Sequence, residues 1–259
     1  MQPTGSLVFD RAVDFYDKTR SLSSATMSEL VTLLREQLGT GPCLEIGVGT
    51  GRIALPLLES GTDLVGLDLS QPMMRRLVDN AGGRRPCPLV AGDATSLPFT
   101  DHAFNGALAV HVLHLIPGWR VAARELLRVV RPGGSLVIDI GRQTQGPFRD
   151  LLAAFTAAAR IPDTHRGVND ADELDAVMTE AGAALRKSDV MIEKRSATYT
   201  KTIDSLEAGT YSITWSADEA TRKTAAEHTR RWAEQRYGEL DQPYEYHLEI
   251  SLRGYRLPS

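Results

Sequence analysis

Apolar residues recur along the chain with two spacings, and the change of spacing divides the sequence. Before residue 41 the apolar positions have helical period, and Thr26 and Glu29 have the spacing of a capping box at the start of that helix. Gly39 marks its end. From residue 42 to residue 140, short apolar runs alternate with stretches of helical period, a pattern typical of strands separated by helices.

Five apolar runs in this segment predict five strands: Cys43–Val48, Asp63–Leu69, Pro88–Ala91, Ala107–Val112 and Ser135–Ile140. Strands connected through helices form βαβ units, and the parallel sheet that results has helices on both faces. The segment therefore predicts an α/β fold with a doubly wound, mainly parallel sheet.

After residue 140 the alternation is less regular. An apolar face between residues 148 and 155 predicts a helix whose apolar side we interpret as core rather than as the wall of a substrate pocket. Two further helices open with pairs that have capping-box spacing: Asp170 with Glu173, and Ser216 with Glu219. The longer of these two helices should end at Gly238.

Two more strands are predicted in this part of the chain, Val190–Tyr199 and Tyr244–Leu252. In the second of them apolar and polar residues alternate, so one face is wetter than the other. We expect it to be the final strand of a seven-stranded sheet, antiparallel to its neighbours and near an edge.

Composition excludes several classes of protein. The chain has 259 residues and a formal net charge of −4, and no part of it has the excess of basic residues expected of a nucleic-acid binder. No apolar run approaches a membrane span, and the first residues lack the pattern of a signal peptide. The two cysteines provide neither a disulfide framework nor zinc-ligand spacing. These observations predict a soluble, cytoplasmic protein without a metal site.

The segment Leu44-Glu45-Ile46-Gly47-Val48-Gly49-Thr50-Gly51-Arg52 follows a predicted strand and opens a helix. Glycines there allow a sharp turn and let a ligand approach the backbone beside the positive end of a helix. A dinucleotide fingerprint would place its third glycine at position 52, where the chain has Arg. The segment also lacks the Gly-Lys-Ser/Thr of a phosphate-binding P-loop.

This acid followed by Gly-x-Gly-x-Gly resembles the first motif of the class I S-adenosylmethionine-dependent methyltransferases. Further segments match that family over residues 40–140: Val65-Gly66-Leu67-Asp68-Leu69-Ser70, Gly92-Asp93-Ala94 with Leu97-Pro98-Phe99, Val110-His111-Val112-Leu113-His114, and Leu126 to Gly134. Departures are small, with Glu45 in place of the commoner Asp and Asn105 in place of an Asp at the fourth strand.

The resemblance implies that S-adenosylmethionine is the cofactor and S-adenosylhomocysteine the product. It places Asp68 on the ribose hydroxyls, Glu45 near the amino-acid end and the segment after Asp93 near adenine. An N-terminal Tyr16 and Arg20 would fold over the cofactor, the alternative being a solvated amphipathic helix. The implied cofactor-binding residues are Tyr16, Arg20, Glu45, Gly47, Gly49, Gly51, Asp68, Leu69, Met73, Asp93, Ala94 and Val110.

His111 and His114 should end the fourth strand, beside the position of the transferred methyl group. Histidine titrates near neutral pH, so either could be the general base if the acceptor is protonated. Alternatively one lines the pocket and the other forms a local hydrogen bond. A metal site is the weakest interpretation, because no third ligand is evident.

The sequence thus predicts an N-terminal helical lid over residues 1–40 and a methyltransferase domain over 41–259, with a second helical lid at about 141–185. The predicted reaction is an in-line methyl transfer to a small-molecule acceptor, carried out by a monomer or homodimer without nucleic-acid or membrane partners. Two alternatives remain open. One is a non-catalytic protein that binds S-adenosylmethionine or S-adenosylhomocysteine, and the other is an NAD(P)-dependent oxidoreductase.

Overall fold

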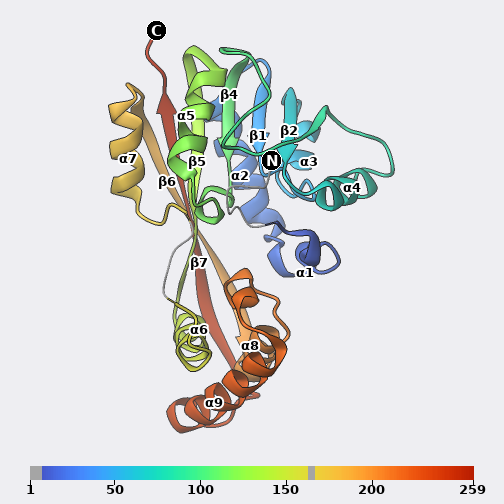
Figure 1. Cartoon of the computed structure of the whole chain (residues 1–259), viewed down its shortest axis with the longest axis vertical. Helices are drawn as coiled ribbons and strands as arrows, with labels where there is room; N and C mark the ends of the chain where they lie inside the picture. The colour runs from blue at the N-terminus through green and yellow to red at the C-terminus, as the bar shows by residue number, and fades with distance from the viewer. Residues whose placement is uncertain (1–7, 163–166) are drawn as a thin grey trace. The chain divides into compact units, whose positions relative to one another are not determined.

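Seven strands form one sheet in the computed structural model, which describes residues 8–162 and 167–259 (Figure 1). Their order across the sheet is β3-β2-β1-β4-β5-β7-β6. The strands are β1 (Cys43–Ile46), β2 (Leu64–Asp68), β3 (Leu89–Ala91), β4 (Phe104–Ala109), β5 (Val130–Gln145), β6 (Ala184–Thr198) and β7 (Pro243–Arg256).

The first five strands are parallel, and the last runs against them. Each pairing among β1 to β5 is parallel. Beside β5, the Gly133 amide donates to Pro258 O (2.8 Å) and the Leu257 amide donates to Gly134 O (2.9 Å). Residue numbers rise on one segment as they fall on the other, which is the antiparallel pattern. The predicted fold class is confirmed, and β7 lies one strand in from the edge that β6 forms.

The chain divides into two compact units. The first comprises the described residues of 8–141, 167–191 and 250–259, and the second comprises 142–162 and 192–249. β5, β6 and β7 contribute residues to both units. The predicted lid at about 141–185 has residues in each unit, and its role as a lid stays a prediction.

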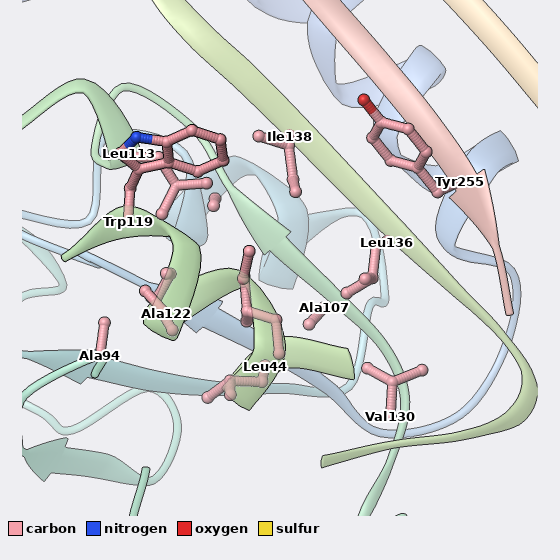
Figure 2. Close-up of a cluster of buried hydrophobic side chains, with 14 of the residues drawn as sticks. Leu44, Ala94, Ala107, Leu113, Trp119, Ala122, Val130, Leu136, Ile138 and Tyr255 are labelled. Carbon is pink, nitrogen blue, oxygen red and sulfur yellow. The ribbon is translucent and has the colours of Figure 1, made fainter. Parts of the chain in front are cut away.

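Helices cover both faces of the sheet in the first unit. α5 (Trp119–Val129) and α7 (Ala171–Glu180) share a core with Leu44 and other strand residues. Figure 2 shows part of this core, including Trp119 and Ala122 of α5. α2 (Ser24–Leu38), α3 (Ala54–Glu59) and α4 (Gln71–Asn80) share a second core with Cys43. Neighbouring residues of one strand thus enter different cores, which explains why the strands are apolar on both faces.

The same alternation places two acidic side chains. Glu45 lies two residues from Cys43 on β1, and Asp139 lies two residues from Val137 on β5. Cys43 and Val137 both belong to the core beneath α2, α3 and α4. Since side chains alternate along a strand, both acids point to that face of the sheet.

The second unit is built from α6 (Pro147–Ala158), α8 (Tyr199–Glu207) and α9 (Glu219–Tyr237). Phe148, Leu151 and Phe155 of α6 are buried in its core, so the interpretation of this face as core is confirmed. Aromatic rings stack there, with 4.6 Å between the centroids of Tyr199 and Tyr237. The described residues also form the short helices η1 (Asp10–Ala12), α1 (Tyr16–Arg20), η2 (Leu113–Leu115) and η3 (Ser212–Ser216).

Several predicted boundaries were wrong. α2 is capped by Ser23, whose hydroxyl accepts a hydrogen bond from the Thr26 amide, and α9 is capped by Asp218 rather than Ser216. β4 begins and ends three residues before the predicted Ala107–Val112 run. α8 was not predicted, because its first residue was assigned to the preceding strand. The predicted caps Asp170 and Gly238 are confirmed.

Among the described helices, none combines the length and the apolar character needed to span a bilayer.

Candidate functional site

A cavity lies where the carboxyl ends of β1 to β4 meet at one edge of the first unit's sheet. Its walls come from the loop after β1, the end of β2, the segment after β3 and the turn after β4. They include Gly47, Gly49, Asp68, Asp93, Ala94 and His111. Open parallel sheets bind ligands at this edge, so the cavity is the candidate site.

The glycines of the loop after β1 have distinct structural roles. Gly47, Gly49 and Gly51 all have positive φ, between 55° and 81°. A Cβ on Gly47 would lie 2.5 Å from a methyl carbon of Val112, inside the cavity wall, whereas one on Gly49 would make ordinary contact with Met73. A Cβ on Gly51 would instead meet Leu77 of α4 at 2.7 Å. Gly47 and Gly49 thus line the cavity, and Gly51 allows α4 to pack closely.

Asp68 connects the end of β2 to the glycine-rich loop. One carboxylate oxygen accepts a hydrogen bond from the Gly49 amide (2.8 Å), and the other accepts from the Ser70 amide (2.7 Å). Burial raises the pKa of Asp68, an effect that these two amides oppose. Each carboxylate oxygen has a second lone pair, so Asp68 can hold the loop and also accept from a ligand.

Ser70 extends this connection to the next helix and to the N-terminal segment. Its hydroxyl caps α4 by accepting from the Met73 amide, and it donates to Asp10 at 2.5 Å. Leu69 and Met73, on either side of this cap, both line the cavity.

An acidic and a basic side chain, Glu45 and Arg52, flank the glycine-rich loop and have buried polar atoms. Glu45 is 2% exposed, and its Oε2 has no hydrogen-bond partner among the described residues. Burial raises the pKa of Glu45 to about 8, although the nearby Arg52 guanidinium lowers it in part. Nε and Nη1 of Arg52 are likewise buried and lack a hydrogen-bond partner in the described part of the chain. Buried polar groups are almost always paired, so these two indicate a ligand with matching groups.

The N-terminal segment lies over this region. Phe9 and Tyr16 line the cavity, with their rings edge to face. Asp17 accepts hydrogen bonds from the Thr50 hydroxyl (2.5 Å) and the Asn80 amide (3.0 Å), which fixes α1 to the loop and to α4. Arg20 ends α1. Of the predicted pair, Tyr16 is thus a cavity residue, while the described lining of the cavity does not include Arg20.

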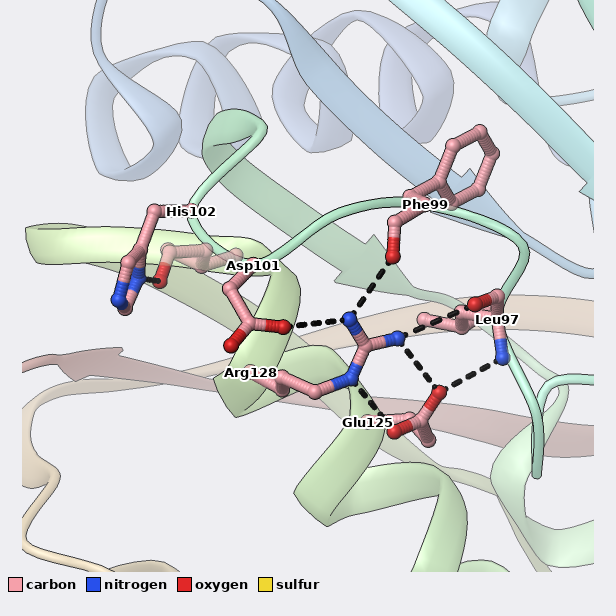
Figure 3. A network of polar contacts seen from close by, with 7 residues as sticks. Leu97, Phe99, Asp101, His102, Glu125 and Arg128 are labelled. Atoms are coloured by element: carbon pink, nitrogen blue, oxygen red, sulfur yellow. Dashed lines mark hydrogen bonds and ion pairs between the residues drawn. The ribbon is translucent and has the colours of Figure 1, made fainter.

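Side chains of α5 form hydrogen bonds that hold the segment after β3 in place. Arg128 donates to the carbonyl oxygens of Phe99 (2.8 Å) and Leu97 (3.1 Å), and Glu125 accepts from the Leu97 amide (2.7 Å), as Figure 3 shows. Asp93 accepts from the amide and hydroxyl of Thr95. These contacts fix the wall of the cavity formed by Asp93 and Ala94.

Known proteins share this fold and this sequence pattern. The family described as methyltransferase domain matches residues 44–138. Two demethylmenaquinone methyltransferases are similar: that of Mycolicibacterium paratuberculosis is 36% identical over 62% of this chain and 70% of its own length, and that of Renibacterium salmoninarum 33% over 59% and 65%. The chain belongs to the methyltransferase family. Its resemblance to the class I S-adenosylmethionine-dependent methyltransferases is thereby confirmed.

Other relatives of this methyltransferase differ in the acceptor they are named for. The malonyl-[acyl-carrier protein] O-methyltransferase of Legionella pneumophila is 29% identical over 68% of this chain and 62% of its own length. The chain thus spans about two thirds of the length of these relatives. Among solved structures, the YcgJ protein of Bacillus subtilis (TM-score 0.60, 20% identity, 91% and 99% of the two chains) shares the fold. So does the [4+2]-cyclase SpnF (TM-score 0.60, 19% identity, 98% of both chains).

The prediction that the two histidines of the methyltransferase end the fourth strand was wrong, because β4 stops at Ala109. His111 lies in the turn that follows, lines the cavity and has a φ of 59°. His114 lies in η2, and its ring stands against Gly141, where a Cβ would be 3.0 Å away. The structure therefore brings His111 to the cavity and gives His114 a packing position.

Val110 was predicted as a cofactor contact, and the structure places it in the core beneath α2, α3 and α4. Val112, two residues later, lines the cavity instead.

The sequence did not indicate the two residues whose side chains approach His111, Arg52 and Asp139. Arg52 Nη2 lies 3.2 Å from His111 Nδ1, and Asp139 Oδ2 lies 3.1 Å from the same nitrogen. Arg52 follows the last glycine of the motif, and Asp139 stands inside an apolar run. Only the folded sheet brings them together. Within the described residues, no group of three or more His, Cys, Asp or Glu side chains is placed to hold a metal ion.

Proposed function

We propose that the chain transfers a methyl group from S-adenosylmethionine to a small-molecule acceptor, with the cofactor held in the cavity at the ends of β1 to β4. The observation that carries this proposal is the pair of buried groups beside the glycine-rich loop. Oε2 of Glu45, and Nε and Nη1 of Arg52, have no hydrogen-bond partner among the described residues. The amino-acid end of S-adenosylmethionine carries an ammonium and a carboxylate, which match an acceptor and a donor pair respectively.

The remaining walls suit the nucleoside part of the cofactor. Asp68 has lone pairs left to accept from the two ribose hydroxyls after holding Gly49 and Ser70. Asp93 and Ala94 lie where the family contacts adenine, on a segment fixed by Arg128. Phe9 and Tyr16 would cover the bound cofactor, since they line the cavity from the N-terminal segment.

When bound, the cofactor supplies a methyl group on a sulfonium, whose departure as a neutral thioether needs no help from an acid. The residues of the chain orient the reactants and exclude water. If the acceptor carries its nucleophilic atom protonated, His111 is the candidate to take up that proton, because it lines the cavity and histidine titrates near neutral pH.

The class of acceptor is proposed on two grounds. The relatives are named for demethylmenaquinone and for malonyl-[acyl-carrier protein]. The net charge of −4 is not the excess of basic residues typical of nucleic-acid binders. The family match covers residues 44–138, so we assign the choice of acceptor to segments outside it, the N-terminal segment among them.

A non-catalytic cofactor-binding protein is the second candidate, since a fold does not by itself determine a reaction. Two measurements separate the candidates. Calorimetry should show binding of S-adenosylmethionine and S-adenosylhomocysteine but not of NADH. Incubation with S-adenosylmethionine deuterated at the methyl group should then label a member of an acceptor panel that includes quinols and carboxylic acids, as detected by mass spectrometry.

Binding of NADH alone would refute the proposal. Tight cofactor binding without transfer to any member of the panel would favour the non-catalytic candidate.

A further inference from the structure

Asp139 is a carboxylic acid buried in an apolar strand. Its side chain is 0% exposed, and its neighbours on β5 are Ile138 and Ile140. One carboxylate oxygen accepts a hydrogen bond from the Gly141 amide, and the other lies 3.1 Å from His111 Nδ1. Burying a carboxylate is costly unless it is paired. His111 is one partner of Asp139 at this position.

His111 is held in an uncommon conformation. Its φ of 59° lies in the left-handed region, which is unfavourable for a residue other than glycine. Such strain persists where the surroundings fix it, and it clusters at functional sites. The strained turn is what presents the imidazole to both the cavity and Asp139.

Nδ1 of His111 stands between opposite charges. Asp139 approaches it from β5, and Arg52 Nη2 approaches it from the glycine-rich loop at 3.2 Å. A carboxylate can only accept a hydrogen bond and a guanidinium can only donate one, so the two compete for the same nitrogen. Among the described residues, the other titratable groups that line the same cavity as His111 are Tyr16, Asp68 and Asp93. Glu45 interacts electrostatically with Arg52, and His114 stands against Gly141.

We propose that Asp139 is a positioning residue of the methyl transfer: it holds the Nδ1–H of His111, so that Nε2 is the nitrogen that takes the proton from the acceptor. This inference rests on the proposed function. As the acceptor atom forms its bond to the methyl carbon, the bond from that carbon to the sulfonium sulfur breaks and its electron pair stays on the sulfur of S-adenosylhomocysteine. The acceptor's O–H or N–H proton moves to Nε2. Asp139 stabilises the resulting imidazolium, which later gives the proton to water. Arg52 opposes the positive charge and keeps the ring neutral before reaction.

Two substitutions separate this role from a structural one. Asp139→Asn removes the charge but keeps an oxygen that can accept from Gly141 N. Asp175→Asn is the matched control, because Asp175 is an acid of the same unit that accepts from Arg253 and Tyr255 on β7. Affinity for S-adenosylhomocysteine should change less than twofold in both variants, which also shows that they are folded.

The first test is nuclear magnetic resonance of ¹⁵N-labelled histidine, with His111 assigned through His111→Gln. In the wild-type protein the shifts should show the Nδ1–H tautomer. The pKa of His111 should fall by about one unit in Asp139→Asn and rise by a similar amount in Arg52→Gln, since a carboxylate favours the charged ring and a guanidinium disfavours it. Asp175→Asn should leave it unchanged. The Nε2–H tautomer in the wild type, or an unchanged pKa in Asp139→Asn, would overturn the inference without any assay of activity.

The second test uses the active enzyme. Asp139→Asn should lower kcat about 10–100-fold and move the acidic limb of the pH–rate profile to lower pH, the range expected when a general base is impaired. Added to His111→Ala, it should have no further effect. A second loss of similar size in that background would mean that Asp139 acts elsewhere. If the wild type transfers no methyl group at all, the proposed function has failed, whereas an unchanged profile in an active Asp139→Asn enzyme defeats only this inference.

Discussion

Glu45 and Asp139 are carboxylic acids set among apolar side chains, on the same face of the sheet. Their side chains are almost completely buried, and their nearest strand neighbours belong to the core. At this depth a carboxyl group must be neutral, paired with a cation or matched by a ligand. Asp139 has His111 close by, and Glu45 interacts electrostatically with Arg52. The burial of these two carboxyl groups therefore lowers the stability of the fold.

Glu45 should make stability depend on pH. Its pKa is about 8 in the folded protein, above the ordinary value of 4.5. Between these two values the folded state binds more protons than the unfolded state, so stability falls as pH rises through this window. Glu45→Gln should therefore gain stability over the wild type as pH rises from 5 to 8, by on the order of a few kcal/mol. Denaturation in urea at a series of pH values measures this difference.

Glu29→Gln, at an exposed position of α2, is the control and should follow the wild type throughout. Parallel curves for the wild type and Glu45→Gln would show that Glu45 is ionised in the folded protein.

Asp68 should contribute to cofactor affinity in two ways, by accepting from the ligand and by holding Gly49. Asp68→Ala removes both, and we expect the Kd for S-adenosylhomocysteine to rise about 10–100-fold, as for the loss of hydrogen bonds to a charged group. Asp63→Ala, at the exposed amino end of the same segment, should bind normally. Calorimetry on the two variants decides the point, and equal affinities would restrict Asp68 to a structural role.

Some residues of the candidate site could be identified from the sequence, and others could not. Glu45, Gly47 and Asp68 stand in motifs whose spacing carries the signal. Gly47 and Asp68 line the cavity, and Glu45 is buried on β1, two residues before Gly47. Arg52 and Asp139 carry no such signal. Asp139 is separated from His111 by 28 positions, and the two meet only because β4 and β5 are neighbours in the sheet.

Among the elements, α1 and η1 have the clearest functional consequence. Asp10 accepts from Ser70, and Asp17 accepts from Thr50 and Asn80, so this short segment is fixed to the cavity by side-chain hydrogen bonds. A helix of this length is not stable by itself, and its position depends on such contacts.

Asp17→Ala should release the segment. We expect the Kd for S-adenosylhomocysteine to rise about 3–10-fold, consistent with the loss of one or two hydrogen bonds. Proteolysis within residues 8–20 should become faster. Asp14→Ala, at an exposed position of the same segment, is the matched control. If both variants bind like the wild type, the segment does not contribute to the cofactor site.

Element boundaries were harder to predict than element types. The run from Ala107 to Val112 is apolar throughout, but β4 ends at Ala109. Val110 continues into the core beyond the last strand hydrogen bond, so hydrophobicity extends past the strand. Nothing in the sequence indicates that the next residue, His111, turns into the left-handed region.

At the scale of the whole molecule, the described residues that line the cavity all belong to the first of the two units. The second unit has its own core around α6, α8 and α9. The pattern of apolar residues predicted the helices at 147–158 and 219–237, but it could not show that 142–162 and 192–249 form a separate unit, because that division depends on contacts distant in sequence.

Destabilising the second unit should therefore leave cofactor binding intact. Phe155→Ala removes a fully buried ring of α6 and should cost about 3–5 kcal/mol in the unfolding of that unit. The Kd for S-adenosylhomocysteine should stay within twofold of the wild type. Leu57→Ala, at a fully buried position of α3 in the first unit, should weaken binding. A tenfold loss of affinity in Phe155→Ala would show that the second unit supports the cofactor site.

Glu45 and Arg52 are proposed to receive the amino-acid end of S-adenosylmethionine. Calorimetric comparison of S-adenosylhomocysteine with 5′-methylthioadenosine, which lacks the ammonium and carboxylate, measures what that end contributes to binding. The wild type should bind S-adenosylhomocysteine at least tenfold more tightly, and Arg52→Gln should reduce that preference while leaving the affinity for 5′-methylthioadenosine unchanged. Equal affinity of the wild type for the two ligands, or no binding of S-adenosylhomocysteine, would contradict the claim.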